Sequence, residues 1–456
     1  MAGNGTAAMD GQFPNGFTWG VATAAYQIEG APRADGRGES IWDRFSHTPG
    51  KIVDGSSGDV ACDHYHRWRE DVALMRQLGV NAYRFSVAWP RVVPAGRGAV
   101  NQKGLDFYDR LTEELLEAGI TPWVTLYHWD LPQPLEDQGG WPNRATADAF
   151  AAYTDAVTRR LGDRVKHWIT LNEPWCSAHL GYELGHHAPG RRNLALALRA
   201  SHSLLLGHGL AMEIIRENSR GAAAGITLNL AQVYPATDST ADDEAARRLD
   251  GYQTRWFLDP LYGRGYPEDM LDLYGANAPE AEPADFRIIA APTDFLGLNY
   301  YHPTFARNEP AAEPLRATSV RVPGEYTQMD WLVEPSGLYD LMMRVSREYG
   351  AGAIYVTENG AAYPDSMPRN GLVEDPERTT YFAKHLRACH HAIADGVPLK
   401  GYFAWSLMDN FEWAFGYTRR FGITYVDYQT QARTIKQSGH YYARVVAGNR
   451  LVDGDE

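Results

Sequence analysis

The chain has 456 residues, of which 44% are hydrophobic and 22% are charged. This is an ordinary globular composition, and a chain of this length can bury a large core. The formal net charge of −14 argues against a nucleic acid or an anionic membrane as partner, because both need a basic face that displaces counterions. The length does not demand two domains, because barrels of alternating strands and helices can exceed roughly 400 residues.

The cysteines indicate a reducing environment. Cys62, Cys176 and Cys389 are widely spaced, odd in number and without a CxxC pair, which predicts neither a disulfide framework nor a zinc site. The first sixteen residues lack the basic start and apolar stretch of a signal peptide, and no window of about 18 apolar residues occurs. We therefore expect a cytoplasmic protein that does not associate with a membrane.

Along the chain, an amphipathic segment, a glycine and an apolar run recur as one unit. Residues 68–89 place apolar side chains at helical spacing up to Leu78, have Gly79 where the helix should end, and continue as a strand. The next unit begins at Asn101, a candidate helix cap, and its helix should stop at Gly119 before another strand. The predicted repeating unit is therefore a helix followed by a strand.

Eight segments meet the criterion for such strands, each apolar at its start and polar or aromatic at its end. They are residues 17–23, 81–89, 121–129, 167–173, 224–230, 294–301, 353–359 and 400–408. This pattern is typical of barrel strands whose carboxyl ends line an active site. An open, doubly wound sheet would usually carry a Gly-rich phosphate turn, and no GxGxxG or Walker-type run occurs.

We therefore predict an α/β protein with a single (β/α)₈ barrel, the TIM-barrel architecture. The expected catalytic domain covers residues 10–448, and residues 1–9 and 449–456 are expected to be flexible termini. Long connections should lie as loops over the carboxyl-terminal mouth of the barrel. These connections are residues 29–66, 174–223 and 302–335.

Two glutamates close apolar runs whose other members must be buried. Glu173 ends the fourth predicted strand in TLNEP, and Glu358 ends the seventh in VTENG. In a closed barrel both would face the same mouth from nearly opposite walls. Hydrolysis of an acetal needs a proton for the leaving oxygen and a negative charge facing the developing oxocarbenium carbon. The pair therefore predicts a glycosidase.

Five motifs in this order resemble glycoside hydrolase family 1. They are TAAYQIEG (23–30), HWDLP (128–132), TLNEP (170–174), VTENG (356–360) and WSLMDNFEW (405–413). The resemblance spans roughly residues 12–446. NEP alone is less specific, since other barrel glycosidases with glutamates on strands four and seven share it.

The resemblance implies a role for each catalytic residue. Glu173 resembles the general acid/base and Glu358 the nucleophile, with Arg84 and Tyr301 placed to hydrogen-bond Glu358. A nearby guanidinium would depress the pKa of that carboxyl group. The family retains configuration at the anomeric carbon, which implies carboxyl groups about 5–5.5 Å apart.

A substrate pocket is also implied by the resemblance. In the glycone part, Asn172 would hold the 2-hydroxyl, and the peptide bond between Trp405 and Ser406 would be cis. Trp331 would form the aglycone platform, with Trp175, Cys176 and His187 as weaker candidates. The substrate-binding residues implied are Gln27, His128, Trp129, Asn172, Asn299, Trp331, Trp405, Glu412, Trp413 and Phe421.

Within the family, the segment after the eighth strand favours unphosphorylated sugars. Relatives that act on 6-phosphorylated sugars replace the Glu-Trp pair by small residues, whereas Glu412 and Trp413 are intact here, and an anionic Glu412 would repel a phosphate. Plant thioglucosidases carry Gln where this chain has Glu173. We therefore expect a retaining, exo-acting β-glucosidase with β-galactosidase or β-fucosidase side activity.

Two other classes stay open at this point. A silent barrel that only binds glycans would normally have lost a carboxylate, and an endo-acting glucanase would need an open cleft. The pairs His64/His66, His186/His187 and His390/His391 lack the spacing of a metal site, and the resemblance implies no metal or cofactor. The expected partner is a small-molecule carbohydrate, and the chain could be a monomer or a homodimer.

Overall fold

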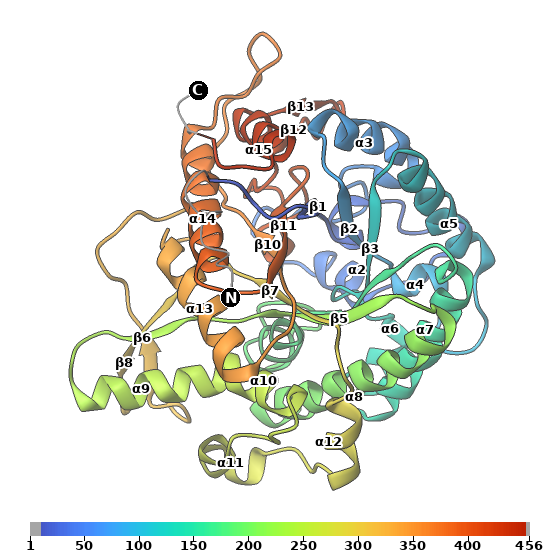
Figure 1. Ribbon diagram of the computed structural model, residues 1–456. Helices are drawn as coiled ribbons and strands as arrows, with labels where there is room; N and C mark the ends of the chain where they lie inside the picture. Colours follow the sequence, from blue (N-terminus) through green and yellow to red (C-terminus); the bar gives the residue numbers. More distant parts are fainter. Residues whose placement is uncertain (1–10, 453–456) are drawn as a thin grey trace, which may run out of the picture.

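The computed structural model describes residues 11–452, and eight parallel strands form a closed barrel at its centre (Figure 1). These strands are β1 (Thr18–Ala22), β2 (Ala82–Ser86), β3 (Thr121–Tyr127), β4 (His167–Asn172), β5 (Ala223–Asn229), β7 (Phe295–Asn299), β10 (Ile354–Asn359) and β11 (Leu399–Trp405). Their order around the barrel is β1-β11-β10-β7-β5-β4-β3-β2. Each corresponds to one of the eight predicted strands, so the predicted barrel fold is confirmed.

Helices surround the barrel because consecutive parallel strands need crossover connections. They are α1 (Ala25–Ile28), α2 (Ile41–Ser46), α3 (His64–Leu78), α4 (Trp89–Val92), α5 (Gln102–Glu117), α6 (Gln133–Glu136), α7 (Ala145–Leu161), α8 (Leu194–Asn218), α9 (Thr240–Asp250), α10 (Trp256–Leu261), α11 (Glu268–Tyr274), α12 (Pro283–Ile289), α13 (Pro335–Tyr349), α14 (Pro376–Ala394) and α15 (Gln437–Gly448). Shorter 3₁₀ or π segments are η1 (Ala34–Gly36), η2 (Cys176–Glu183), η3 (Gly251–Arg255), η4 (Gly275–Asn277) and η5 (Trp413–Phe415). Around the outside α3, α5, α7 and α8 pack in turn, and α13, α14 and α15 lead back to α3 (Figure 1).

Both predicted helix–strand units form, and the structure differs from the prediction in the role of Asn101. Helix α3 ends at Gly79, whose φ of +70° is the left-handed conformation that glycine adopts without strain. Helix α5 starts directly after Asn101, but the Asn101 side chain does not cap it. Its amide instead donates to the carbonyls of Asp35 and Arg91, at 2.8 and 2.9 Å. Asn101 therefore joins two loops, and the prediction of its capping role is wrong.

The connections over the barrel contain more regular structure than predicted. The interpretation of residues 174–223 as a loop is wrong for Leu194–Asn218, which form the 25-residue helix α8 of the outer ring. Buried residues lie on most sides of α8, so the sequence lacks the single apolar stripe by which a helix is recognised. Short strands complete the connections: β6 (Val233–Pro235), β8 (Thr304–Asn308) and β9 (Ala317–Ser319) form one small sheet, and β12 (Thr424–Val426) pairs with β13 (Arg433–Ile435).

The two ends of the described chain lie together. Gln12 pairs with Arg450, and the Asn449 side chain accepts a hydrogen bond from Trp19 Nε1 at 2.8 Å and donates to the Phe13 carbonyl at 2.9 Å. Of the termini predicted to be flexible, 1–9 and 449–456, residues 1–9 and 453–456 lie outside the described range. No helix between residues 11 and 452 is long and apolar enough to cross a membrane.

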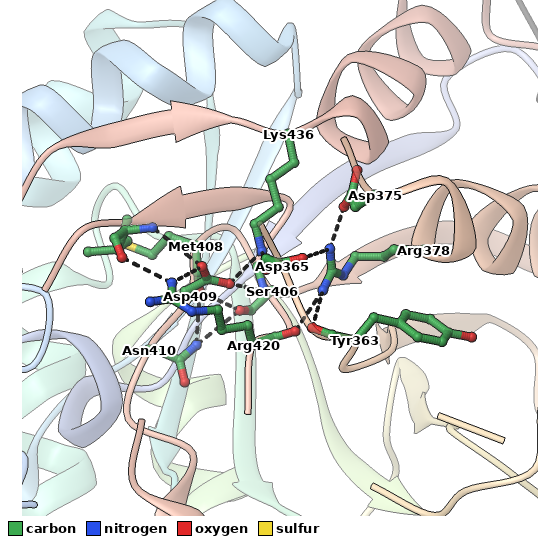
Figure 2. A network of polar contacts seen from close by, with 12 residues as sticks. Tyr363, Asp365, Asp375, Arg378, Ser406, Met408, Asp409, Asn410, Arg420 and Lys436 are labelled. Atoms are coloured by element: carbon green, nitrogen blue, oxygen red, sulfur yellow. Dashed lines mark hydrogen bonds and ion pairs between the residues drawn. The ribbon is translucent and has the colours of Figure 1, made fainter. Parts of the chain in front are cut away.

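A buried network of charges includes residues of the loop that follows β11 (Figure 2). It contains three carboxylates and three cations whose formal charges cancel: Asp365, Asp375, Asp409, Arg378, Arg420 and Lys436. The Lys436 ammonium is fully buried and pairs with Asp365 and with Asp409, the latter at 2.7 Å. The network therefore joins the loop after β10, the loop after β11 and the residue before α15.

This network also supports the segment that carries part of the candidate pocket. Asp409 accepts a backbone hydrogen bond from Gly422 at 3.0 Å, and its neighbour Asn410 accepts one from Gln27 Nε2 at 2.9 Å. The Asn410 amide in turn donates to Ser406 Oγ at 3.0 Å. The charged network thus holds residues 406–412 in the conformation that reaches the cavity.

We expect Lys436→Met to destabilise the protein strongly, because the carboxylates of Asp365 and Asp409 would lose a buried cation. Breaking one partner of a buried pair costs about 3–5 kcal/mol, which corresponds to a fall of roughly 3–5 °C in the thermal midpoint of a chain this long. Calorimetry at neutral pH measures this. The matched control is Lys400→Gln, an exposed lysine at the opposite end of β11, for which the midpoint should not change. An unchanged midpoint for Lys436→Met would contradict the role of the network.

Candidate active site

A cavity of about 740 Å³ opens at the carboxyl ends of the barrel strands. Both Glu173 and Glu358 line it, as predicted. The other predicted residues that line it are His128, Trp129, Asn299, Tyr301, Trp331, Trp405, Glu412, Trp413 and Phe421, together with the weaker candidates Trp175, Cys176 and His187. Gln27, Arg84 and Asn172 do not line it, but lie fully buried behind the lining side chains.

Glu358 in β10 has both carboxylate oxygens engaged. Oε1 accepts a hydrogen bond from Arg84 Nη1 at 2.6 Å, and Oε2 accepts one from the Tyr301 hydroxyl at 2.6 Å. Arg84 lies in the middle of β2 rather than at its end, with no exposed surface. Donors of this kind stabilise the ionised carboxylate, which is the form that a nucleophile needs.

Glu173 directly follows β4 and has neutral donors instead. Its Oε1 accepts from Asn299 Nδ2 at 2.6 Å, and its Oε2 accepts from the Cys176 thiol at 3.1 Å. Cys176 lies one helical turn further along, and its backbone N–H donates to the Glu173 carbonyl at 3.0 Å. The surroundings of Glu173 therefore favour its charged form less than those of Glu358 do.

These surroundings separate the acidities of the two carboxyl groups. Burial raises the pKa of Glu173 to about 8, and the charge of Glu358 adds to the rise. Burial also raises the pKa of Glu358, whereas Arg84 and Tyr301 lower it. Arg84 therefore acts in the expected direction, and burial opposes it. A proton shared by the pair rests on Glu173.

Arg84 connects the nucleophile to the rest of the site. Its Nη2 donates to Asn172 Oδ1 at 2.6 Å, and Asn299 Nδ2 donates to the same oxygen at 3.0 Å. Because Asn172 Oδ1 accepts both bonds, its Nδ2 faces His128 Nε2 at 2.9 Å as a donor. Arg84 thus orients an amide that lies beside both glutamates.

This orientation also determines which nitrogen of His128 carries the proton. Burial and the charge of Arg84 lower the pKa of His128 well below its ordinary value, so the ring is neutral. Nε2 accepts from Asn172, so the proton sits on Nδ1. Nδ1 is buried and has no partner among residues 11–452. It is therefore an unpaired donor in a residue that lines the cavity.

Gln27 lies buried directly behind Glu412, in the part of the cavity wall that the loop after β11 supports. Gln27 Nε2 donates to Asn410 Oδ1 and to the Phe411 carbonyl, both at 2.9 Å, and approaches Glu412 Oε2 at 3.4 Å. The Gln27 amide oxygen is buried and has no partner in the described part of the chain. It is an acceptor that a sugar hydroxyl could satisfy.

Glu412 is less acidic than an exposed carboxyl group. Burial, and next the charge of Glu358, raise the pKa of Glu412 to about 8, which favours the protonated form at neutral pH. The expected repulsion of a phosphate applies to the anionic form of Glu412 only. A protonated Glu412 can instead donate a hydrogen bond to a neutral hydroxyl.

Aromatic rings form much of the cavity wall. The ring centroid of His128 lies 5.9 Å from those of Trp405 and Trp413, and both interplanar angles are 24°. Trp331 is half-buried, and its ring centroid lies 5.0 Å from that of Tyr301. Apolar ring faces of this kind bind the C–H faces of sugars and the rings of aryl groups.

The backbone around these side chains is strained. Trp129, Glu173 and Trp413 have φ values of +79°, +47° and +48°, and such conformations of non-glycine residues cost of order 1–3 kcal/mol each. The peptide bond between Trp405 and Ser406 is cis, as predicted. Gly360 lies so close to this strand that a Cβ on it would meet the Trp405 carbonyl oxygen at 1.7 Å. The loop after Glu358 therefore requires glycine here.

Several lining residues were not predicted. Asn229 ends β5 and donates to the Cys176 thiol at 3.5 Å, and its place at a strand end was a usable signal. His302 follows Tyr301 directly and stacks on Trp331, with ring centroids 5.3 Å apart. Lys51 and Arg192 line the cavity from loops and carry no strand-end signal. In the described chain no group of three or more His, Cys, Asp or Glu side chains could hold a metal ion.

Known proteins resemble this chain over nearly its whole length. Beta-glucosidase A of Acetivibrio thermocellus is 50% identical over 441 residues, which cover 96% of this chain and 98% of that protein. A bifunctional beta-D-glucosidase/beta-D-fucosidase of Bifidobacterium breve is 46% identical, over 95% of this chain and 98% of that protein.

The fold is shared with solved structures as well. A Thermotoga maritima family 1 glycoside hydrolase, solved with a cyclophellitol analogue that mimics the transition state, superposes with a TM-score of 0.95 at 49% identity, over 97% of this chain and 100% of that one. The family profile described as Glycosyl hydrolase family 1 matches residues 9–451. With the two carboxyl groups in one barrel mouth, these matches show that the chain belongs to glycosyl hydrolase family 1.

Proposed function

We propose that this chain is a retaining, exo-acting β-glucosidase that uses Glu173 as general acid/base and Glu358 as nucleophile. Its substrates are short oligosaccharides and aryl or alkyl glucosides with a terminal non-reducing β-D-glucosyl residue. The observation that carries the proposal is the unequal pair of carboxyls, one held by Arg84 and Tyr301 and the other by neutral donors. Relatives named as β-glucosidases support the sugar, and the β-D-fucosidase relative supports a side activity.

In the first step Glu358 attacks the anomeric carbon and forms a glycosyl ester. The bond to the leaving oxygen breaks, and that oxygen takes the proton of Glu173. Esterification removes the charge of Glu358, which is one of the causes that raise the pKa of Glu173. Glu173 then takes a proton from water, the water oxygen attacks the anomeric carbon, and glucose leaves with Glu358 free again.

We infer that unpaired polar atoms in the inner wall of the cavity and directly behind it bind the sugar hydroxyls. The Nδ1 proton of His128 and the amide oxygen of Gln27 supply a donor and an acceptor for hydroxyl groups, and a protonated Glu412 supplies another donor. We propose that Asn172, beside both glutamates, contacts the 2-hydroxyl, where hydrogen bonds strengthen in the transition state. Trp405 supplies the apolar face.

We also propose the bounds of the catalytic domain, the location of the protein and its assembly. The catalytic domain has the bounds 10–448. The location is cytoplasmic, supported by Cys62, Cys176 and Cys389, which are all free and buried. The assembly is a monomer or a homodimer.

Replacement of the nucleophile should give a diagnostic rescue. We expect Glu358→Gly to lower kcat for an aryl β-glucoside by roughly 10⁴-fold or more, because no carboxylate remains to form the ester. Azide fits the space left by the side chain and attacks from that face, so α-glucosyl azide should form. NMR of the product identifies its anomeric configuration.

The matched variant is Glu173→Ala. Here the ester still forms with an activated aryl leaving group, and azide attacks it from the other face, so β-glucosyl azide should form. Full activity of Glu358→Gly without azide, or the same azide anomer from both variants, would rule out the two roles.

The Cys176 thiol provides a way to test the acid/base. Its hydrogen bond to Oε2 stabilises the charged form of Glu173 and so lowers the pKa of that group. Kcat/KM should fall as the pH rises through about 8, the pKa of Glu173, because the free enzyme loses its acid there. In Cys176→Ala this alkaline limb should move up by roughly 0.4–1 pH unit, the equivalent of one hydrogen bond.

Two controls separate this effect from general damage. Cys176→Ser keeps a donor, so its limb should lie at or below that of the wild type. Cys389→Ala removes a fully buried thiol of α14 far from the cavity and should leave the limb in place. The account of Glu173 fails if Cys176→Ala moves the limb down or if Cys389→Ala moves it equally.

A further inference from the structure

Two loops meet at the mouth of the cavity, and each contributes a cation. Lys51 follows α2, and Arg192 precedes α8. The loops touch at Gly190, where a Cβ would lie 3.1 Å from Phe45 and 3.4 Å from Lys51 Nζ. The ammonium group also lies 5.3 Å from the centre of the Phe45 ring. His186, exposed on the second loop, also lines the cavity.

Neither cation has an anionic partner in the described part of the chain. Across residues 11–452, the side chains of Lys51 and Arg192 take part in no ion pair or hydrogen bond. The neighbouring Arg191 behaves differently, because it pairs with Glu136 at 3.1 Å. Asp54, near Lys51 in sequence, is engaged by the Tyr417 backbone N–H at 2.8 Å. Two unpaired cations therefore face the cavity in a chain of net charge −14.

Charge is distributed unevenly along the cavity. Of the described residues that line it, the acidic ones are Glu173, Glu358 and Glu412, and all three are buried at its inner end. An anionic group on the sugar would approach the ionised Glu358. An anionic group on the leaving portion would lie toward Lys51 and Arg192 instead, where opposite charges attract.

We propose that the mouth is a subsite for aglycones that carry a carboxylate, which Lys51 and Arg192 bind through charge-assisted hydrogen bonds. The inference rests on the proposed β-glucosidase function and adds a substrate class to it. The aromatic part of such an aglycone lies against Trp331, and its carboxylate reaches the solvent edge. Because Arg192 is exposed and Lys51 only half-buried, the attraction is partly screened by water and salt.

Two glucosides that differ in charge alone test this. One is 4-(2-carboxyethyl)phenyl β-D-glucoside and the other is its carboxamide, since the ethylene spacer keeps the two phenol leaving groups nearly equal. The measured quantity is the ratio of kcat/KM for the carboxylate to kcat/KM for the amide. At low ionic strength we expect a ratio of about three to ten in the wild type, falling toward one at about 0.5 M salt.

Charge-reversal variants assign the effect. In Lys51→Glu/Arg192→Glu the ratio should fall below one, with each single variant in between. Lys400→Gln, the exposed lysine at the other end of the barrel, should keep the wild-type ratio. Because the readout is a ratio, a general loss of activity does not affect it.

The outcomes distinguish this inference from the proposed function. A wild-type ratio at or below one, or an unchanged ratio in the double variant, overturns the anionic subsite while hydrolysis of the amide upholds the β-glucosidase. If neither glucoside is hydrolysed, the proposed function fails. Calorimetric binding of the same two compounds then still decides the subsite, since equal affinities would overturn it.

Discussion

The hydrogen bonds of Arg84 at the centre of the barrel are the interaction on which the rest of the site depends. This guanidinium has no exposed surface and donates to Glu358, Asn172 and Thr125. A buried cation is tolerable only when it is paired and its donors are used. Closure of the barrel meets this condition, because it brings β2, β3, β4 and β10 around one point. Arg84 then fixes Asn172, and through it the proton position on His128.

The unequal chemistry of the two glutamates follows from this arrangement. Glu358 has the cation and Glu173 does not, so the same burial leaves Glu358 ionised and Glu173 as the proton carrier. Glu412, also buried and near Glu358, holds a proton for a similar reason. The charge network around Lys436 supports the segment that carries Glu412. Site and scaffold are therefore coupled through the loop after β11.

Much of this could be predicted from the sequence, because strand ends and motifs depend on local pattern. All eight strands, and residues such as Glu173 and Trp331, lie where predicted. Features that depend on contacts between residues far apart in the sequence could not be predicted. Helix α8 has no single apolar stripe, the Asn101 amide joins two loops, and the acidity of Glu412 depends on burial that only the folded barrel creates. The unpaired cations at the mouth depend on how loops meet, which no motif records.

Glu173 carries the proton because it is buried and because Glu358 is ionised beside it. The most direct measurement is a ¹³C NMR titration of labelled glutamate side chains, in the free enzyme and after Glu358 has been trapped as a 2-deoxy-2-fluoroglucosyl ester. The account predicts that Glu173 titrates near 8 in the free enzyme, above Glu358, and that its pKa falls by about one unit or more in the ester. An unchanged pKa of Glu173 in the ester, or a Glu358 that titrates above Glu173, would contradict it.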